Sequence, residues 1–188
     1  FFEWSKCEGI FRPAEKLLDN EKEKQRYECH TNNSDDLGYQ NFVLPITSSV
    51  LKEYKKDDLG LDFGCGKDSP IVKVLRQKEY QIFEYDPYFF DDKKLLEEKY
   101  DYIACCEVIE HFYNPKKEFE LLKKLLKEDG VLYLMTGIYN DNIDFSKWWY
   151  KNDLTHVFIF QEETFEWIKK EFAFKDMKIE KNFIRLSR

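Results

Sequence analysis

The sequence lacks the features that mark membrane proteins, disulfide-stabilised proteins and zinc proteins. No apolar run approaches the roughly 20 residues that a membrane-spanning helix needs, and no signal peptide opens the chain. The five cysteines are an odd number, and none are spaced C-x-x-C, which argues against a zinc site and a disulfide framework. We therefore expect a cytoplasmic protein that neither enters a membrane nor holds a metal.

The sequence also lacks a surplus of positive charge. It has 37 acidic and 30 basic residues, which gives a net charge of −7. Lysine-rich stretches such as "NPKKEFELLKK" are interleaved with glutamate, as on solvated helix faces. Non-specific nucleic-acid binding needs a basic surface, so we do not expect it. These features indicate no particular oligomeric state.

Strand and helix patterns alternate regularly from residue 57 onward. This rhythm predicts a Rossmann-like α/β fold, a three-layer sandwich in which a mostly parallel sheet of about seven strands carries helices on both faces. Residues 1–54 are charged and mostly helical in pattern, and we expect them to form an N-terminal helical extension or lid. Strands are expected at 59–63, 80–86, 100–108 and 130–137 and as one or two edge strands in 177–188; helices are expected from 69, from 114 to a C-cap at Gly130, and over 162–172.

The stretch "LDFGCGKDSP", residues 61–70, has the outline of a nucleotide-binding turn. Ser69 replaces the third glycine of G-x-G-x-x-G, and Asp62 and Asp68 add two carboxylates. Two carboxylates would repel a bound pyrophosphate. They suit a cationic nucleoside without phosphates, and S-adenosylmethionine is a ligand of that kind.

Asp86 follows Gly66 by 20 residues, at the end of the next expected strand. An acid at this place accepts hydrogen bonds from ribose hydroxyls in nucleotide-binding folds. The alternative is that Asp86 and Pro87 form only a turn. The distance from the glycine loop favours ribose binding.

Four segments in order resemble the motifs of class I S-adenosylmethionine-dependent methyltransferases: "LDFGCG", "FEYDPYF", "YDYIACCEVIEHFYNP" and "DGVLYLMTG". The E-V-x-E-H and D-x-T-H segments are similar to those of a small-molecule branch, and residues 55–188 would be the S-adenosylmethionine-binding domain. The resemblance implies that the glycine loop backs onto the cofactor, that an acid before it fixes the loop, and that the next two strand ends hold the ribose, adenine and methionine parts. The implied cofactor residues are Asp62, Gly64, Cys65, Gly66, Asp86, Pro87, Tyr88, Cys106 and Glu107. Asp68 departs from the family pattern.

Two of the three histidines are candidate catalytic residues. His111 would be a general base or acceptor ligand, or else it ties the next helix to a loop. His156 could be oriented by Asp153, or Asp153 and Thr155 could cap a turn there. We interpret His30 as a surface histidine. The aromatic loop between the last expected parallel strand and helix 162–172 offers Tyr139, Trp149, Tyr150 and Asp153 as candidate acceptor contacts, with core packing as the alternative for its aromatic residues.

The sequence therefore predicts in-line methyl transfer from S-adenosylmethionine, with S-adenosylhomocysteine as product, to a small acceptor. Two alternatives stay open. One is a regulatory or accessory protein that binds the cofactor without turnover. The other is a nicotinamide-dependent oxidoreductase, against which Ser69 and the loop carboxylates argue.

Overall fold

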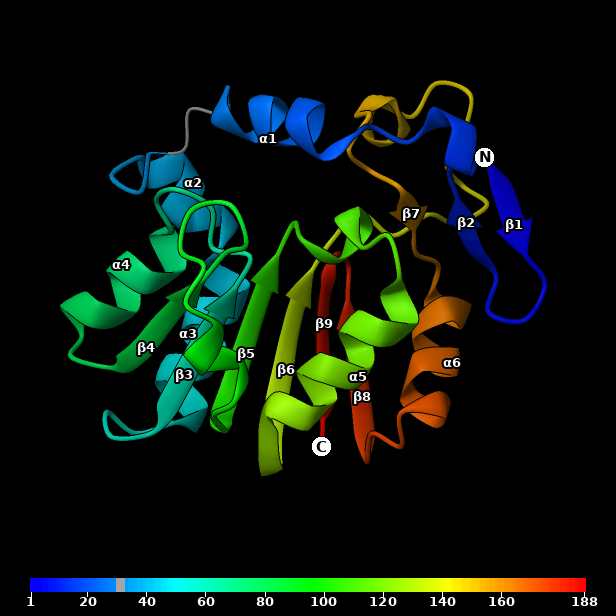
Figure 1. Ribbon diagram of the computed structural model, residues 1–188. Coiled ribbons are helices and arrows are strands. Elements are labelled where there is room, and N and C mark those ends of the chain that lie inside the picture. Colours follow the sequence, from blue (N-terminus) through cyan, green and yellow to red (C-terminus); the bar gives the residue numbers. More distant parts are fainter. Residues whose placement is uncertain (30–32) are drawn as a thin grey trace.

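A six-stranded sheet forms the centre of the computed structural model, which describes residues 1–29 and 33–188 (Figure 1). The strand order is β4-β3-β5-β6-β9-β8. The pairs among β3, β4, β5 and β6 are parallel, and β9 is antiparallel to both β6 and β8. The strands are β3 Leu59–Phe63, β4 Gln81–Tyr85, β5 Tyr100–Cys106, β6 Leu126–Met135, β8 Asp176–Glu180 and β9 Phe183–Ser187.

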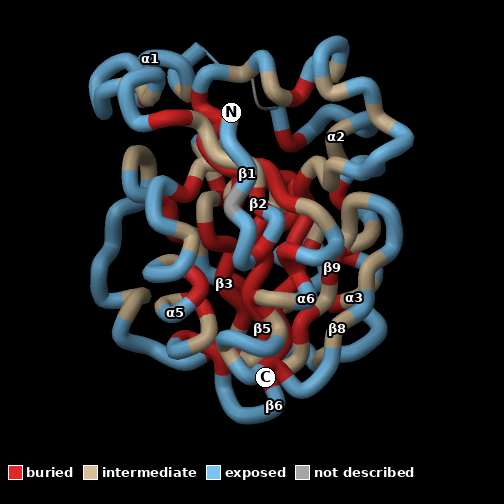
Figure 2. Tube along the Cα trace, turned by 90° about the vertical axis from the view of Figure 1, so that its right-hand side faces the viewer, coloured by how far each residue is buried: buried red, intermediate tan, exposed pale blue. Residues whose placement is uncertain are grey.

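Helices cover both faces of this sheet. The helices α3 Leu44–Glu53 and α4 Pro70–Gln77 bury apolar side chains on one face, and α5 Pro115–Leu125 and α6 Glu162–Glu171 do so on the other. Between the layers β3, β5 and the second half of β6 are buried along most of their length, whereas the edge strands β4 and β8 are mostly not (Figure 2). The expected three-layer α/β sandwich with a mostly parallel sheet is confirmed, with six strands where about seven were expected.

The N-terminal segment differs in part from its prediction. The segment holds helices α1 Asn20–Glu28 and α2 Leu37–Phe42, and α1 lies above the carboxyl ends of the strands (Figure 1). Before them, however, β1 Phe2–Trp4 and β2 Gly9–Phe11 form a hairpin that pairs with β7 Phe158–Ile159 in a second, three-stranded sheet. Residues 10 and 11 pair with residues 159 and 158, which lie far away in the sequence. The hairpin therefore depends on a tertiary contact that the local pattern of residues 1–11 does not reveal. That residues 1–54 form a lid stays a prediction.

The C-cap expected at Gly130 was wrong. Helix α5 ends at Leu125, and Leu126 already has extended backbone and pairs with Tyr100 of β5. Gly130 therefore lies inside β6, where an added Cβ would come within 3.1 Å of the Asp101 carbonyl oxygen. Close backbone approach, rather than a helix end, accounts for this glycine.

The turn from β3 into α4 forms as the sequence predicts. Pro70 opens the helix, and the Ser69 hydroxyl accepts a hydrogen bond from the Val72 N–H at 3.2 Å, as an N-cap does. The same hydroxyl donates to the Asp62 carboxylate at 2.5 Å. Asp62 is only 2% exposed, and burial raises the pKa of its carboxyl group to about 7, although the Ser69 hydrogen bond opposes that rise.

No helix among the described residues is long and apolar enough to span a bilayer.

The raised pKa of Asp62 predicts a pH-dependent effect of replacing it by asparagine. Between its ordinary pKa and about 7 the folded state holds the proton that the unfolded state has released, so wild-type stability falls as pH rises through this window. Asp62→Asn cannot ionise and keeps an oxygen that can accept from Ser69. In urea unfolding, the stability of Asp62→Asn relative to wild type should rise by about 2–3 kcal/mol between pH 5 and pH 8. A difference that does not change with pH would show that Asp62 is not protonated in the fold.

Candidate active site

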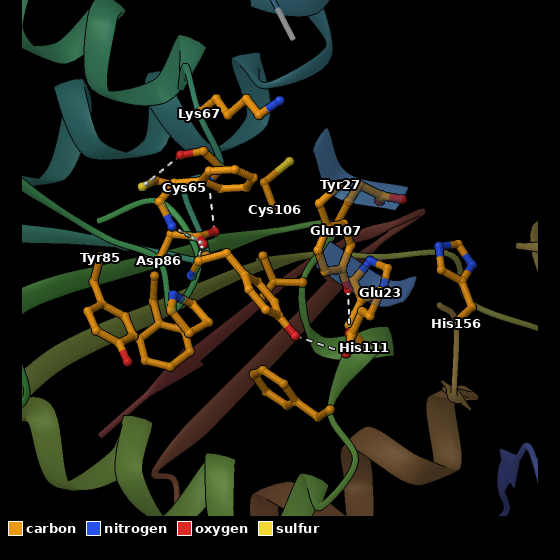
Figure 3. Close-up of a pocket in the computed structure, with 18 of the residues that line it drawn as sticks. Glu23, Tyr27, Cys65, Lys67, Tyr85, Asp86, Cys106, Glu107, His111 and His156 are labelled. Atoms are coloured by element: carbon orange, nitrogen blue, oxygen red, sulfur yellow. Dashed lines mark hydrogen bonds between the residues drawn. The ribbon is translucent and has the colours of Figure 1, made fainter. Parts of the chain in front are cut away.

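The loops after β3, β4 and β5 surround a cleft of about 950 Å³ at the carboxyl ends of the strands (Figure 3). Strand β3 pairs with β4 on one side and with β5 on the other, so the chain changes direction across the sheet at β3. Ligands of open α/β sheets bind at such a switch point. Residues of α1 line the opposite wall of the cleft.

The glycine loop after β3 is fixed by backbone hydrogen bonds. The N–H groups of Gly64 and Cys65 both donate to the Tyr85 carbonyl oxygen, at 2.8 and 3.2 Å. Gly64 has a φ of +81° and Gly66 a φ of +65°, and a Cβ on Gly64 would lie 2.5 Å from a Val108 methyl group. Glycine is therefore required at 64 both by conformation and by space. Gly64, Cys65 and Gly66 all line the cleft, and their binding of a cofactor stays a prediction.

Asp86 joins the glycine loop to the end of β4. One carboxylate oxygen accepts from the Gly66 N–H at 3.0 Å, and the other accepts from the N–H groups of Tyr88 and Phe89 at 2.8 and 3.2 Å. Asp86 thus forms a turn and also lines the cleft, together with Pro87 and Tyr88. The oxygen that accepts from Gly66 keeps a second lone pair with which it can accept from a ligand hydroxyl, whereas the other oxygen already accepts two hydrogen bonds.

The two other loop carboxylates do not line the cleft. Asp62 lies behind the loop on Ser69, so any effect on a cofactor would pass through the loop. Asp68, which departs from the family pattern, accepts a hydrogen bond from the Ser34 N–H at 2.8 Å. This contact ties the glycine loop to the segment before α2 and keeps the pKa of Asp68 below its ordinary value.

The end of β5 brings Cys106 and Glu107 into the cleft. Glu107 has a φ of +53°, which is unusual for a residue with a side chain, and its N–H donates to the Met135 carbonyl oxygen at 2.8 Å. Burial, reinforced by the nearby Glu110, raises the pKa of Glu107 to about 9. Burial and the neighbouring Glu110 thus both disfavour a full negative charge on Glu107.

A buried network lies below these residues. Glu110 is fully buried, and its two carboxylate oxygens accept from the hydroxyl groups of Tyr150, at 2.5 Å, and Thr136, at 2.9 Å. The Tyr150 hydroxyl also accepts from the Gly137 N–H at 3.0 Å. Tyr150, expected as an acceptor contact, is 3% exposed and does not line the cleft. Tyr150 therefore connects the aromatic loop to the end of β6.

His111 and His156 lie together at one end of the cleft, with ring centroids 4.9 Å apart. The Nδ1 of His111 is 2.9 Å from the Thr155 carbonyl oxygen, and the Nδ1 of His156 is 2.7 Å from the Tyr150 carbonyl oxygen. A carbonyl only accepts, so in both neutral rings Nδ1 carries the proton and Nε2 is the basic nitrogen. Burial lowers the pKa of His156, which keeps that ring neutral at pH 7.

Asp153 does not orient the His156 ring as the sequence suggested it could. Its carboxylate accepts from the N–H and hydroxyl of Thr155, at 3.0 and 2.7 Å, and forms an ion pair with Arg26 of α1 at 3.0 Å. Burial opposes ionisation, but these contacts outweigh it and hold the pKa of Asp153 well below its usual range. Asp153 therefore caps a turn and fastens α1 to the aromatic loop.

Glu110, His111 and His156 also form a group that could hold a metal ion. One ligand atom of each lies within 4.8 Å of the others. Both histidines donate Nδ1–H to backbone carbonyls, a common arrangement around metal-binding histidines. No motif in the sequence indicates this group, because His156 follows His111 by 45 positions. The absence of a metal site stays a prediction.

The aromatic loop contributes less to the cleft than predicted. Trp149, Asp153 and His156 line it, and Trp149 is 71% exposed. Tyr139 does not line it; this ring packs against Phe145 and Trp148. His30 lies outside the described residues.

Helix α1 supplies residues that the sequence analysis missed. Asn20, Glu23 and Tyr27 line the cleft. The sequence "NEKEKQRYE" looks like a solvated, charged helix, so it points to no site. The one usable signal is the spacing of Glu23 and Tyr27, which places both side chains on the same helix face.

The sequence of the chain is similar to those of known methyltransferases. Residues 39–179, well over half of the chain, match the family described as a methyltransferase domain. A ubiquinone biosynthesis O-methyltransferase from Glaesserella parasuis serovar 5 is 51% identical over 39 residues, which are 21% of this chain and 16% of that protein.

Solved structures share the fold. Human N-acetylserotonin methyltransferase in complex with S-adenosylmethionine matches with a TM-score of 0.59 and 12% identity, over 94% of this chain and 60% of that one. Phosphoethanolamine N-methyltransferase 2 from Haemonchus contortus, in complex with phosphomonomethylethanolamine and S-adenosylhomocysteine, matches with a TM-score of 0.57 and 16% identity, over 86% of this chain and 43% of that one. The chain thus spans less than two thirds of each of these relatives. The chain belongs to the methyltransferase-domain family, which confirms its resemblance to methyltransferases, and it shares the fold of these S-adenosylmethionine-dependent enzymes.

Proposed function

We propose that this chain transfers the methyl group of S-adenosylmethionine to a small acceptor bound beneath α1. The observation that carries the proposal is the meeting of the glycine loop, Asp86 and the end of β5 in one cleft of about 950 Å³. Ligand pockets of this size hold a nucleoside-sized molecule with room to spare. The space that remains beside His111 is where a small acceptor would lie.

The chemistry of the cleft suits the parts of S-adenosylmethionine. Asp86 would accept hydrogen bonds from the ribose hydroxyls, and Pro87 and Tyr88 would flank the adenine. Gly64 and Gly66 would let the ligand approach the loop backbone, since neither has a Cβ. The methionine part would lie toward Cys106 and Glu107. The described lining holds no arginine, and the ammonium group of Lys67, one of its two lysines, donates to the Glu28 carbonyl oxygen.

Catalysis would come mainly from alignment. Methyl transfer is an in-line displacement, and holding the acceptor atom in line with the methyl group and the sulfur atom supplies much of the rate. An acceptor that must lose a proton needs a base in addition. His111 is the candidate, because it lines the cleft and its Nδ1–H is directed to the Thr155 carbonyl, which leaves Nε2 as the basic nitrogen. His156, 7% exposed, would support the His111 ring from behind.

The function is tested by comparing two ligands. S-adenosylhomocysteine should raise the melting temperature of the protein, and NADH should not, because its pyrophosphate would meet the cleft-lining carboxylates Asp86 and Glu23 and no arginine among the described lining residues. Stabilisation by NADH alone would favour an oxidoreductase. Binding of S-adenosylhomocysteine without methyl transfer to any acceptor in a broad screen would favour an accessory protein.

Replacing Asp86 should weaken cofactor binding. Hydrogen bonds to a charged carboxylate contribute about 1.5–3 kcal/mol, so Asp86→Ala should raise the Kd for S-adenosylhomocysteine at least tenfold in isothermal titration calorimetry. Asp91→Ala, which removes an exposed acid from the same loop region, is the matched control and should bind like wild type. Unchanged affinity of a folded Asp86→Ala variant would remove Asp86 from the ligand site.

Replacing His111 by asparagine separates a base from a structural tie. The asparagine amide can donate to the Thr155 carbonyl as Nδ1 does, but it has no basic nitrogen. With an acceptor found by screening with methyl-labelled cofactor, His111→Asn should lower kcat about 10²–10⁴-fold while the Kd for S-adenosylhomocysteine stays within about twofold of wild type. A variant that keeps wild-type kcat would identify His111 as a tie only.

A further inference from the structure

We propose that the acceptor carries a positively charged ammonium group, which Glu23 of α1 recognises. This inference rests on the proposed methyl transfer and specifies the chemical class of its acceptor. Glu23 lines the cleft, although only 4% of its surface is exposed. It is one of the few carboxylates in the described chain that are both buried and directed into a cavity.

Two tyrosines hold the Glu23 carboxylate in place. One oxygen accepts from the Tyr27 hydroxyl at 2.8 Å, and the other accepts from the Tyr88 hydroxyl at 3.0 Å. Burial is the largest cause that raises the pKa of the nearby Tyr113 phenol to about 12, and the charge of Glu23 is the next. Three tyrosine side chains from α1 and from the loops after β4 and β5 therefore surround one carboxylate.

These hydrogen bonds orient Glu23 but do not balance its charge. No lysine or arginine among the described residues forms an ion pair with it. A buried carboxylate is stable when a cation lies close to it, and a bound ligand is the remaining source of one. The ring of Tyr27, which lies on the His111 side of the cleft, adds an aromatic face that attracts an ammonium group.

The rest of the cleft disfavours an anionic acceptor. Its described lining includes no arginine, the residue that binds carboxylates and phosphates through paired hydrogen bonds. Two lysines line it. The Lys67 ammonium donates to the Glu28 carbonyl oxygen at 2.7 Å and lies over the Phe89 ring, and Lys117 is exposed on α5. An acceptor with a carboxylate or phosphate group would therefore meet Glu23 without a compensating cation nearby.

The location of Glu23 near His111 favours contact with the acceptor over contact with the cofactor. Tyr27, which donates to Glu23, packs edge-on against His111 with ring centroids 5.4 Å apart. In Figure 3 Glu23 lies on the His111 side of the pocket, apart from Cys65 and Asp86. An ammonium group at Glu23 would therefore leave another atom of the same molecule within reach of the candidate base.

Three probes of equal shape and different charge test the inference. Phenethylamine, phenethyl alcohol and phenylacetate are titrated by calorimetry into protein saturated with S-adenosylhomocysteine. The cation should bind at least tenfold more tightly than the alcohol or the anion, because it alone can pair with a buried carboxylate. In Glu23→Gln the amide can still accept from one tyrosine, and the tenfold preference should disappear.

The matched control is Glu21→Gln, which removes the same charge from an exposed position on the same helix. It should keep the preference for phenethylamine. The inference is overturned if phenylacetate binds wild type as tightly as phenethylamine, if phenethylamine shows no saturable binding at millimolar concentration, or if Glu23→Gln and Glu21→Gln behave alike. It is also overturned if Glu23→Gln weakens S-adenosylhomocysteine binding tenfold, which would place Glu23 on the cofactor. Failure of wild type to bind S-adenosylhomocysteine would instead overturn the proposed function.

Discussion

The carboxylate of Asp86 joins the two loops between which the cleft forms. It accepts from the Gly66 N–H of the glycine loop and from the N–H groups of Tyr88 and Phe89 after β4. Without it, three backbone donors at the switch point would lose their partner, and the loop geometry that Gly64 and Gly66 allow would lose its anchor. The acid that forms this turn is thus also the residue that we propose to bind the ribose.

A second constraint organises the end of the cleft that contains His111 and His156. The fully buried Glu110 is satisfied by the hydroxyls of Thr136 and Tyr150, and this network fixes the aromatic loop against the end of β6. Arg26 of α1 then pairs with Asp153 of that loop. The position of α1 over the cleft, and with it that of Glu23 and Tyr27, therefore depends on polar contacts between segments far apart in sequence.

Local patterns predicted the parts of the fold that local chemistry determines. The Ser69 cap, Pro70 and the apolar runs that became β3 and β5 lie where the sequence indicated. The glycine loop and Asp86 also met in one cleft, because parallel strands carry their carboxyl ends to the same edge. The hairpin of β1 and β2 and the end of α5 were missed, since pairing with β7 and β5 decides both.

The residues around His111 and Glu23 could be predicted only in part, because tertiary contacts also determine their positions. The sequence analysis named His111 and His156 as candidates. Their contact with each other and their closeness to Glu110 depend on tertiary packing. Tyr150 is an aromatic residue of the kind that often contacts ligands. In the fold, however, it is buried and donates to Glu110. Glu23 sits in a helix whose charged sequence is typical of a solvated surface, so its burial against Tyr88 could not be read from α1 alone.

A crystal structure of the protein with S-adenosylhomocysteine tests the central claim most directly. The account predicts that the ligand lies in the cleft with its ribose hydroxyls within hydrogen-bond distance of the Asp86 carboxylate and its sulfur atom toward Cys106 and Glu107. A ligand bound elsewhere, or one whose ribose makes no contact with Asp86, would contradict it.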